Sequence, residues 1–118
     1  MEDDPAGSPG ESPTSVEEID SEGAFERLIE SEERVLVDFY ADWCGPCRMM
    51  EPTIEALADE TDAAVLKVDV DRFQGLAGQY GIQGIPALLL FVDGDLAERF
   101  VGVQQEEDLK RSIEGYAG

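Results

Sequence analysis

The two cysteines constrain this chain more than any other feature, because they stand three residues apart in Trp43-Cys44-Gly45-Pro46-Cys47 and the sequence has no others. The motif follows an apolar stretch at 35–40, typical of a strand buried on both faces, and precedes residues with helical spacing. A thiol at a helix N-terminus lies beside unpaired N–H groups and the positive end of the helix dipole, which favour its thiolate. The sequence therefore predicts that Cys44 is the nucleophile and that Cys47, on the same helix face but more buried, is the resolving thiol.

A zinc site is the alternative that a CxxC pair raises. Structural zinc takes four ligands. Because this chain has two cysteines and no histidine, only a site shared across a dimer stays open. The lack of histidine also excludes Ser–His–Asp and Cys–His catalysis. We therefore expect a redox-active Cys44–Cys47 disulfide, with no bound cofactor and no metal.

Length and charge narrow the class of protein further. A chain of 118 residues fits one domain, and 42% hydrophobic residues are enough for a core. The 28 Asp and Glu against 8 Lys and Arg give a net charge of −20, which repels phosphate groups and anionic lipid surfaces. We expect no nucleic-acid partner and no membrane partner. The longest apolar run, Ala87–Val92, is far shorter than the ~20 residues of a membrane-spanning helix.

The first 15 residues differ in composition from the rest of the chain. They contain four acidic residues, three prolines and no basic residue. This composition predicts a disordered acidic tail at 1–15, followed by one folded domain at 16–118. A secretory signal needs a basic start and an apolar stretch. The segment has neither, so we expect a cytoplasmic protein.

The acidic residues are spread along the whole chain, while Asn is absent and Lys67 and Lys110 are the only lysines. Molar salt shortens the Debye length to ~3 Å and so screens the repulsion between these charges. We interpret the composition as that of a halophilic protein, which works in concentrated intracellular salt. The alternative is an ordinary acidic protein with solvated faces.

Hydrophobic periodicity and turn residues predict four helices and four strands. The predicted helices cover 21–31 (capped by Ser21), 45–61 (kinked at Pro52), 73–80 and 105–116. The predicted strands cover 35–40, 65–70, 87–92 and 96–101, the last two joined by a hairpin turn at Asp93-Gly94. This order implies a mixed sheet with helices on both faces.

The residues around the cysteines resemble a known family. The thioredoxin active-site segment is similar at nearly every position to Val37-Asp38-Phe39-Tyr40-Ala41-Asp42-Trp43-Cys44-Gly45-Pro46-Cys47. The cis-proline loop of thioredoxins resembles Gly84-Ile85-Pro86, and other matching positions are Lys67, Asp93-Gly94 and Gly102. The resemblance covers 16–118. It implies an α/β fold of the thioredoxin-like three-layer α/β/α kind, with a central mixed sheet of four to five strands.

The resemblance also implies roles for residues near the cysteines. Asp38, an acid in an otherwise apolar strand, would be buried and would carry protons to and from Cys47, with Lys67 as its neighbour. The alternatives are an edge carboxylate that faces solvent and a solvated strand lysine. The Ile85–Pro86 bond would be cis and would lie beside the sulfurs, where an extended target strand pairs; the alternative is a plain trans turn. The implied substrate-binding residues are Trp43, Gly45, Pro46, Gly84, Ile85, Pro86 and Gly102.

Three positions depart from the usual family pattern. Arg48 stands where many relatives have Lys, which keeps the charge. Tyr40 stands at a position that is often Trp, and Ala87 follows the proline where Thr is common. The loss of Thr at Ala87 is expected to loosen contacts near the sulfurs slightly.

The function implied by the resemblance is reduction of disulfides in other proteins. The partners would be disulfide-containing target proteins and a thioredoxin reductase or another electron donor, and the chain would be a monomer. The Gly-Pro pair between the cysteines resembles the pair found in the reducing members of the family, not in the oxidising ones. Two alternatives stay open. One is a binding module with incidental cysteines, which acts through the apolar rim that the resemblance implies around Cys44, formed by Trp43, Gly84, Ile85 and Gly102. The other is an oxidase or isomerase.

Overall fold

The computed structural model describes residues 16–116, so the tail expected at 1–15 lies outside the described part. Ten elements follow one another along the chain: β1 (Val16–Glu18), α1 (Glu22–Ser31), β2 (Arg34–Tyr40), α2 (Gly45–Met49), α3 (Glu51–Glu60), β3 (Ala64–Asp69), α4 (Gln74–Gln79), β4 (Ala87–Val92), β5 (Asp95–Val101) and α5 (Glu106–Gly115). No helix in this part of the chain has the length and apolar character needed to span a membrane.

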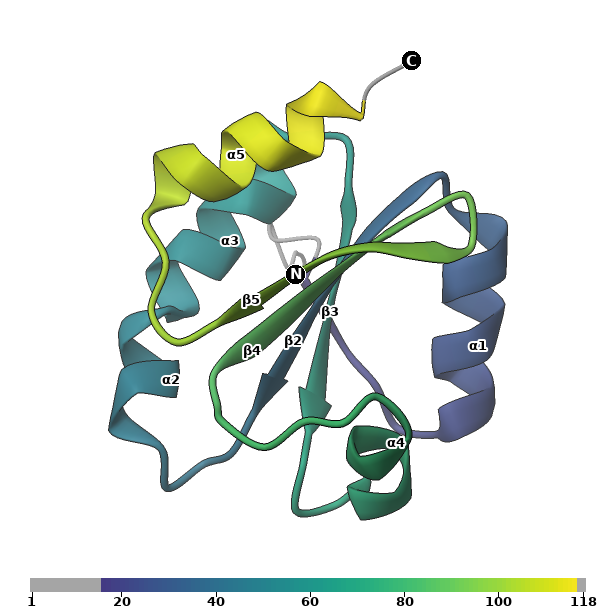
Figure 1. Ribbon diagram of the computed structural model, residues 1–118, viewed down its shortest axis with the longest axis vertical. Helices are drawn as coiled ribbons and strands as arrows, with labels where there is room; N and C mark the ends of the chain where they lie inside the picture. The colour runs from purple at the N-terminus through teal and green to yellow at the C-terminus, as the bar shows by residue number, and fades with distance from the viewer. Residues whose placement is uncertain (1–15, 117–118) are drawn as a thin grey trace, which may run out of the picture.

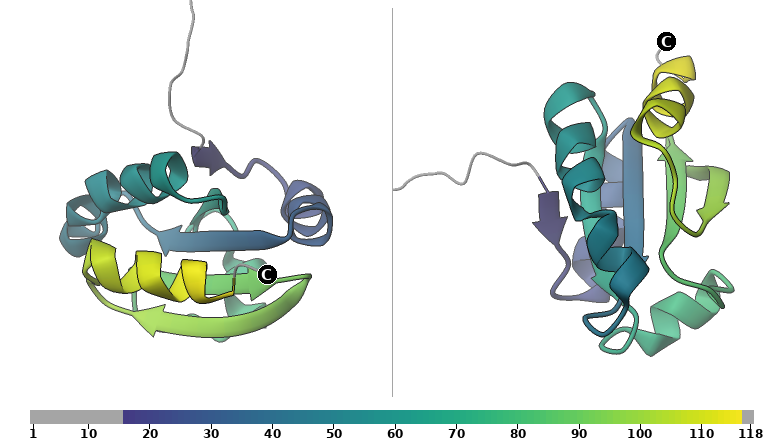
Figure 2. Two further views of the ribbon diagram at one scale, coloured as in Figure 1. Left: turned by 90° about the horizontal axis from the view of Figure 1, so that it is seen from above. Right: turned by 90° about the vertical axis from the view of Figure 1, so that its left-hand side faces the viewer.

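The five strands form one mixed sheet in the order β1-β3-β2-β4-β5. The strands β1, β3 and β2 run parallel, whereas β4 is antiparallel to both β2 and β5. Figure 2 shows β1 and β5 at opposite edges, so β2 and its neighbours are interior strands. The predicted mixed sheet is confirmed. The three-residue β1 was not predicted, because so short a strand shows no alternation in the sequence.

The sheet separates two cores. Alternate residues of a strand face opposite sides: Val37 and Phe39 of β2 pack in the core that contains residues of α1 and α4, whereas Leu36 packs with residues of α3 and α5. Figure 1 shows α1 and α4 on one side of the sheet and α2, α3 and α5 on the other. The predicted three-layer architecture is therefore confirmed. By the same alternation, Asp38 and Tyr40 lie on the face covered by α3.

The helix predicted at 45–61 is divided, and the division lies earlier than the predicted kink. The structure ends α2 at Met49 and begins α3 at Glu51. Pro52 lacks an N–H, and a proline ring clashes with the carbonyl four residues earlier, here that of Arg48. Met50 N–H instead donates to Cys47 O (3.1 Å), a bond that tightens the last turn of α2.

The remaining turns follow the sequence signals closely. The Ser21 hydroxyl accepts a bond from the N–H of Ala24 and caps α1 as predicted. Asp93 and Gly94 both have positive φ angles, 52° and 87°, which is the backbone of a type I′ turn between β4 and β5. The predicted hairpin is confirmed, and it places the end of β5 beside the loop that precedes β4.

Candidate active site

The cysteine pair lies where β2 leads through a short loop into α2. Cys44 is the N-cap of α2, and its Sγ accepts a hydrogen bond from the N–H of Cys47 (3.1 Å). The two sulfurs are joined in a disulfide. In the reduced protein the same N–H would stabilise a thiolate on Cys44, because hydrogen bonding to a charged form favours that form.

Burial does not distinguish the two cysteines. The exposed fraction is 4% for Cys44 and 3% for Cys47, so the two are buried almost alike in this disulfide form, and the expectation that Cys47 is the more buried thiol stays a prediction. Both cysteine side chains pack with Ala41, and the partly buried Tyr40, Val70 and Ile85 pack against them. The difference between them therefore lies in the hydrogen bond to Cys44 and in its place at the start of the helix.

The Ile85–Pro86 peptide bond is cis, so the alternative of a trans turn is wrong. The carbonyl oxygen of Ile85 lies 3.8 Å from Cys44 Sγ. Pro86 O accepts a bond from the N–H of Gly102 (2.8 Å), which brings the chain after β5 next to this loop. Gly102 has a φ angle of 88°, a conformation that suits glycine. The structure thus brings Ile85, Pro86 and Gly102 together beside Cys44.

The other predicted substrate-binding residues have exposed or partly exposed positions. Gly45 and Pro46 are exposed in the first turn of α2, and Gly84 is exposed before the cis bond. Trp43 is 69% exposed, and its indole N–H donates to Asp71 Oδ2 (2.8 Å). That bond fixes the indole against the loop after β3. Trp43 itself directly precedes Cys44 in the sequence.

Asp38 is buried within the sheet, so the alternative of an edge carboxylate is wrong. It is 1% exposed, and no hydrogen-bond partner contacts its Oδ1. Burial raises the pKa of Asp38 to about 7; the Lys67 ammonium opposes this rise, whereas the carboxylates of Glu51 and Glu18 add to it. An acid with a pKa near neutrality can both accept and release a proton at physiological pH.

Lys67 is the neighbour of Asp38 across the β2–β3 ladder, as predicted, but its ion pair is with another residue. Its ammonium lies 3.6 Å from Glu51 Oε2 and 4.2 Å from the centre of the Tyr40 ring. The side chain is 18% exposed, so the alternative of a solvated strand lysine is wrong. Lys67 is therefore held mainly by α3 and by an aromatic face.

Tyr40 ties this region to the edge strand β1. Its hydroxyl donates to Glu18 Oε2 (2.6 Å). Burial, and next the bond to Glu18, raise the pKa of the Tyr40 hydroxyl, so it stays protonated at physiological pH. A tryptophan at this position, as in many thioredoxins, has no hydroxyl at that point of the ring, so this link depends on the departure noted in the sequence.

Four residues near the site were not predicted: Glu18, Glu51, Val101 and Val103. Val101 and Val103 are 59% and 51% exposed and flank Gly102. The match of Gly102 to the family pattern was the only feature of the sequence that pointed to this part of the surface. Glu18 and Glu51 are two acids among 28, and their pairing with Tyr40 and Lys67 follows from packing between elements. Among residues 16–116, no group of three or more side chains with His, Cys, Asp or Glu ligands could hold a metal ion.

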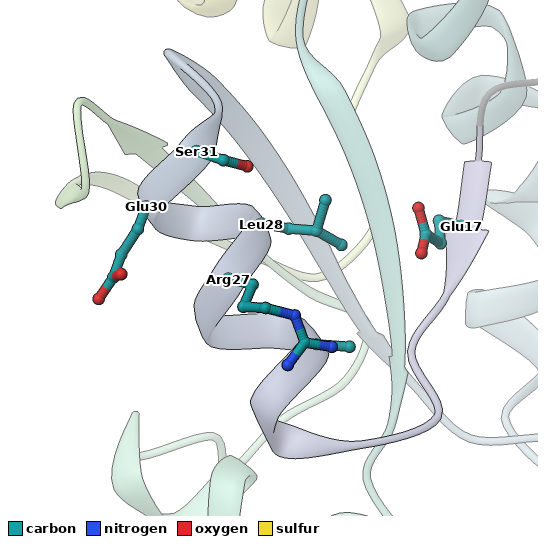
Figure 3. A pocket seen from close by; sticks show the side chains of 6 residues that line it. Glu17, Arg27, Leu28, Glu30 and Ser31 are labelled. Atoms are coloured by element: carbon teal, nitrogen blue, oxygen red, sulfur yellow. The ribbon is translucent and has the colours of Figure 1, made fainter.

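A surface pocket of about 550 Å³ lies between α1 and β1, away from the cysteines. Figure 3 shows Arg27 and Leu28 reaching from α1 toward the side where Glu17 of β1 lies. None of its lining residues belongs to the set around Cys44 or Asp38. This pocket is therefore separate from the cysteine site.

Thiol–disulfide exchange needs a stabilised thiolate and a second thiol close enough to displace it from a mixed disulfide. Cys44 and Cys47 meet both needs, and the cis-proline loop leaves backbone groups beside them. By fold and site, the molecule is a thiol–disulfide oxidoreductase.

The chain belongs to the thioredoxin family: the family model described as Thioredoxin matches residues 16–115. A thioredoxin from Chlorobaculum thiosulfatiphilum is 40% identical over 93 residues, which cover 77% of this chain and 86% of that protein. A thioredoxin from Chlamydia muridarum is 48% identical over 80 residues, covering 67% and 78%. The solved structure of a mutant thioredoxin from Halobacterium salinarum NRC-1 has 45% identity and a TM-score of 0.85, covering 92% of this chain and 97% of that one.

Proposed function

We propose that this thioredoxin reduces disulfides in other proteins by a two-step exchange. The Cys44 thiolate attacks one sulfur of a target disulfide, forms a mixed disulfide and releases the other target sulfur as a thiolate. Cys47, once deprotonated, attacks Cys44 Sγ and releases the second target thiolate. Two electrons pass to the target, and the Cys44–Cys47 disulfide remains. The observation that carries this assignment is the hydrogen bond from the Cys47 N–H to Cys44 Sγ at the start of α2.

Asp38 is proposed to carry the proton in the second step. The Cys47 thiol must lose its proton before it attacks, and a carboxylate with a pKa of about 7 accepts a proton at neutral pH and returns it readily. The burial of Asp38 within the sheet supports this role, because bulk water does not compete for that proton. Lys67 acts through Asp38, by favouring its ionised form.

Target proteins are proposed to dock on the exposed residues around Cys44. The cis-proline loop presents Ile85 O at 3.8 Å from Cys44 Sγ, where an extended target segment could pair with the backbone. Exposed apolar side chains of Trp43, Val101 and Val103 surround this edge and fit an apolar flank on the target. The small residues of this surface would let a target backbone approach closely; they are Gly45, Pro46, Gly84 and Gly102.

The oxidised enzyme must be reduced again for a second cycle. We propose that a thioredoxin reductase, typically a flavoprotein supplied with electrons by NADPH, or another electron donor of the cytoplasm reduces the Cys44–Cys47 disulfide. The enzyme itself would act as a monomer without a bound cofactor, because the exchange needs only the two thiols and a proton carrier.

We also propose that the protein is adapted to high salt. Two observations support this: the net charge of −20 in 118 residues, and the 45% identity to a Halobacterium salinarum thioredoxin. In dilute buffer the Debye length is ~30 Å at 0.01 M, so most surface carboxylates repel one another.

The melting temperature should therefore rise with salt, by about 10 °C or more between 0.01 M and 2 M KCl, since each kcal/mol shifts it by several degrees in a domain of this size. The rise should be steep at first, because repulsion is screened early, and gentler later. Thermal unfolding in a KCl series measures this. A melting temperature that stays flat or falls would show that the acidity is ordinary surface solvation.

The reduction potential of the Cys44–Cys47 couple tests the proposed direction of the reaction. Thioredoxins as a class have potentials of about −270 mV, a known value rather than a result of this structure, whereas oxidising relatives lie near −120 mV and isomerases near −180 mV. We expect a value close to that of the reducing class in equilibrium with a thiol buffer. A value near −180 mV or above would instead support an oxidase or isomerase.

A further inference from the structure

Lys67 lies among four other side chains that together form what we name the Lys67 cluster: Glu18, Asp38, Tyr40, Glu51 and Lys67. These residues come from β1, β2, α3 and β3. Three of the five are acids, and Lys67 is the one cation among them. The place that the ammonium takes within the cluster therefore decides which carboxylate it neutralises.

Two groups other than Asp38 hold the ammonium. Glu51 Oε2 lies 3.6 Å from Lys67 Nζ, and the Tyr40 ring lies beneath the ammonium at 4.2 Å. Tyr40 is itself anchored by its bond to Glu18. Within the described residues, no ion pair joins Lys67 to Asp38, although the two face each other across the ladder.

The surroundings of Asp38 make it sensitive to this arrangement. Its Oδ1 is buried without a hydrogen-bond partner. The charged groups that act on it are Lys67 from β3, Glu51 from α3 and Glu18 from β1. On the other side, β4 places the apolar Leu88 opposite Asp38. Movement of the ammonium toward Asp38 would thus stabilise the Asp38 carboxylate further, because Lys67 is the one cation that acts on it among the described residues.

We propose that Glu51 is a positioning residue for the resolving step: its carboxylate holds the Lys67 ammonium toward α3 and so limits how strongly the ammonium stabilises the Asp38 carboxylate. The proposal rests on the proposed function of Asp38 as the proton carrier. Glu51 keeps the pKa of Asp38 near the pH of the medium through two effects, both of which raise that pKa. It competes for the ammonium, and its own negative charge opposes ionisation of Asp38.

The chain offers a matched control for this proposal one helical turn further along α3. Glu55 is exposed, and it lines the same pocket of about 150 Å³ as Glu51 and Lys67. It forms no ion pair with Lys67 among the described residues. Glu51→Gln and Glu55→Gln therefore remove the same charge from the same face of the same helix, and only the first removes the hold on Lys67.

The experiment follows the titration of the Asp38 carboxyl carbon by NMR in the reduced full-length protein, at one fixed salt concentration. In Glu51→Gln we expect the midpoint to move about one pH unit lower, because Lys67 is released toward Asp38. In Glu55→Gln the midpoint should stay within a few tenths of wild type. The pH profile of the resolving step, measured by stopped flow, should move with the midpoint.

A second background separates positioning from simple charge repulsion. With Lys67→Met, the effect of Glu51→Gln on the midpoint should fall to less than half, since no ammonium remains to be released. An unchanged midpoint in Glu51→Gln, or an equally large shift in the Lys67→Met background, would overturn the proposal. A midpoint that moves while the resolving rate keeps its pH profile would uphold the coupling of Glu51 to Asp38 and instead refute Asp38 as the proton carrier.

Discussion

Asp38→Asn is expected to raise the free energy of unfolding by up to about 4 kcal/mol at pH 8, and by less than half of that at pH 5. The pKa of Asp38 rises from 3.8 to about 7 in the folded protein, chiefly through burial. Each pKa unit of this difference corresponds to about 1.4 kcal/mol in the free energy of unfolding. The folded state retains the proton between these two pKa values and the unfolded state loses it, so the wild type loses stability as the pH rises from 4 to 7. Above pH 7 the whole cost of a buried carboxylate is present, and Asn removes it.

Denaturant unfolding of the oxidised protein at several pH values from 5 to 9 measures this effect. The range stays above the isoelectric point of about 4.1, where the lack of net charge promotes association. Asp42→Asn is the control, because it removes one exposed carboxylate from the loop after β2. A gain from Asp38→Asn that is the same at all pH values, or no larger than that of the control, would mean that Asp38 does not hold a proton in the folded state.

Cys47→Ser is expected to accumulate target proteins as mixed disulfides on Cys44, whereas Cys44→Ser should accumulate almost none. The physical reason is the helix-start position of Cys44, whose sulfur receives the N–H of residue 47 and lies next to the cis-proline loop. Serine at 47 keeps that backbone N–H and removes only the thiol that would release the target. With Cys44→Ser, the remaining thiol lacks the hydrogen bond that stabilises a thiolate.

The comparison is informative because the two cysteines are almost equally buried in the disulfide form. Access alone would predict equal trapping, so a difference reports the chemistry of the two sulfurs. Mixed disulfides are counted on non-reducing gels after brief exposure to a disulfide-containing protein. Equal trapping by the two single variants would contradict the assigned roles, and any trapping by the double Ser variant would reveal a non-disulfide adduct.

Local signals predicted most of the fold correctly. The Asp93-Gly94 turn, the Ser21 cap and the long apolar strands depend on a few neighbouring residues, and the structure has each of them. The strand β1, just before Ser21, was not predicted, because it gains its strand structure only by pairing with β3. The end of α2 also depends on more than proline position, since the last turn tightens through Met50 N–H before Pro52 is reached.

The site was predictable in its residues and less so in its contacts. The CxxC motif predicted the Cys44–Cys47 disulfide, and the acid within an apolar strand predicted a buried Asp38; the structure has both. The partner of Lys67 was not predictable, because Glu51 reaches it from a helix on another part of the chain. Equal burial of the cysteines also could not be inferred, since the cover over Cys44 comes from Ile85, 41 residues away.

A single-turnover reaction between the reduced enzyme and an excess of a disulfide-containing protein tests most directly whether the Cys44–Cys47 pair is a protein-disulfide reductase. The reaction is stopped with acid, and target thiols and enzyme disulfide are counted at each time. We predict that two target thiols appear for each Cys44–Cys47 disulfide formed, and that the double Ser variant forms none. Persistence of the target disulfide with a fully reduced enzyme, or oxidation of the enzyme without new target thiols, would contradict the assigned function.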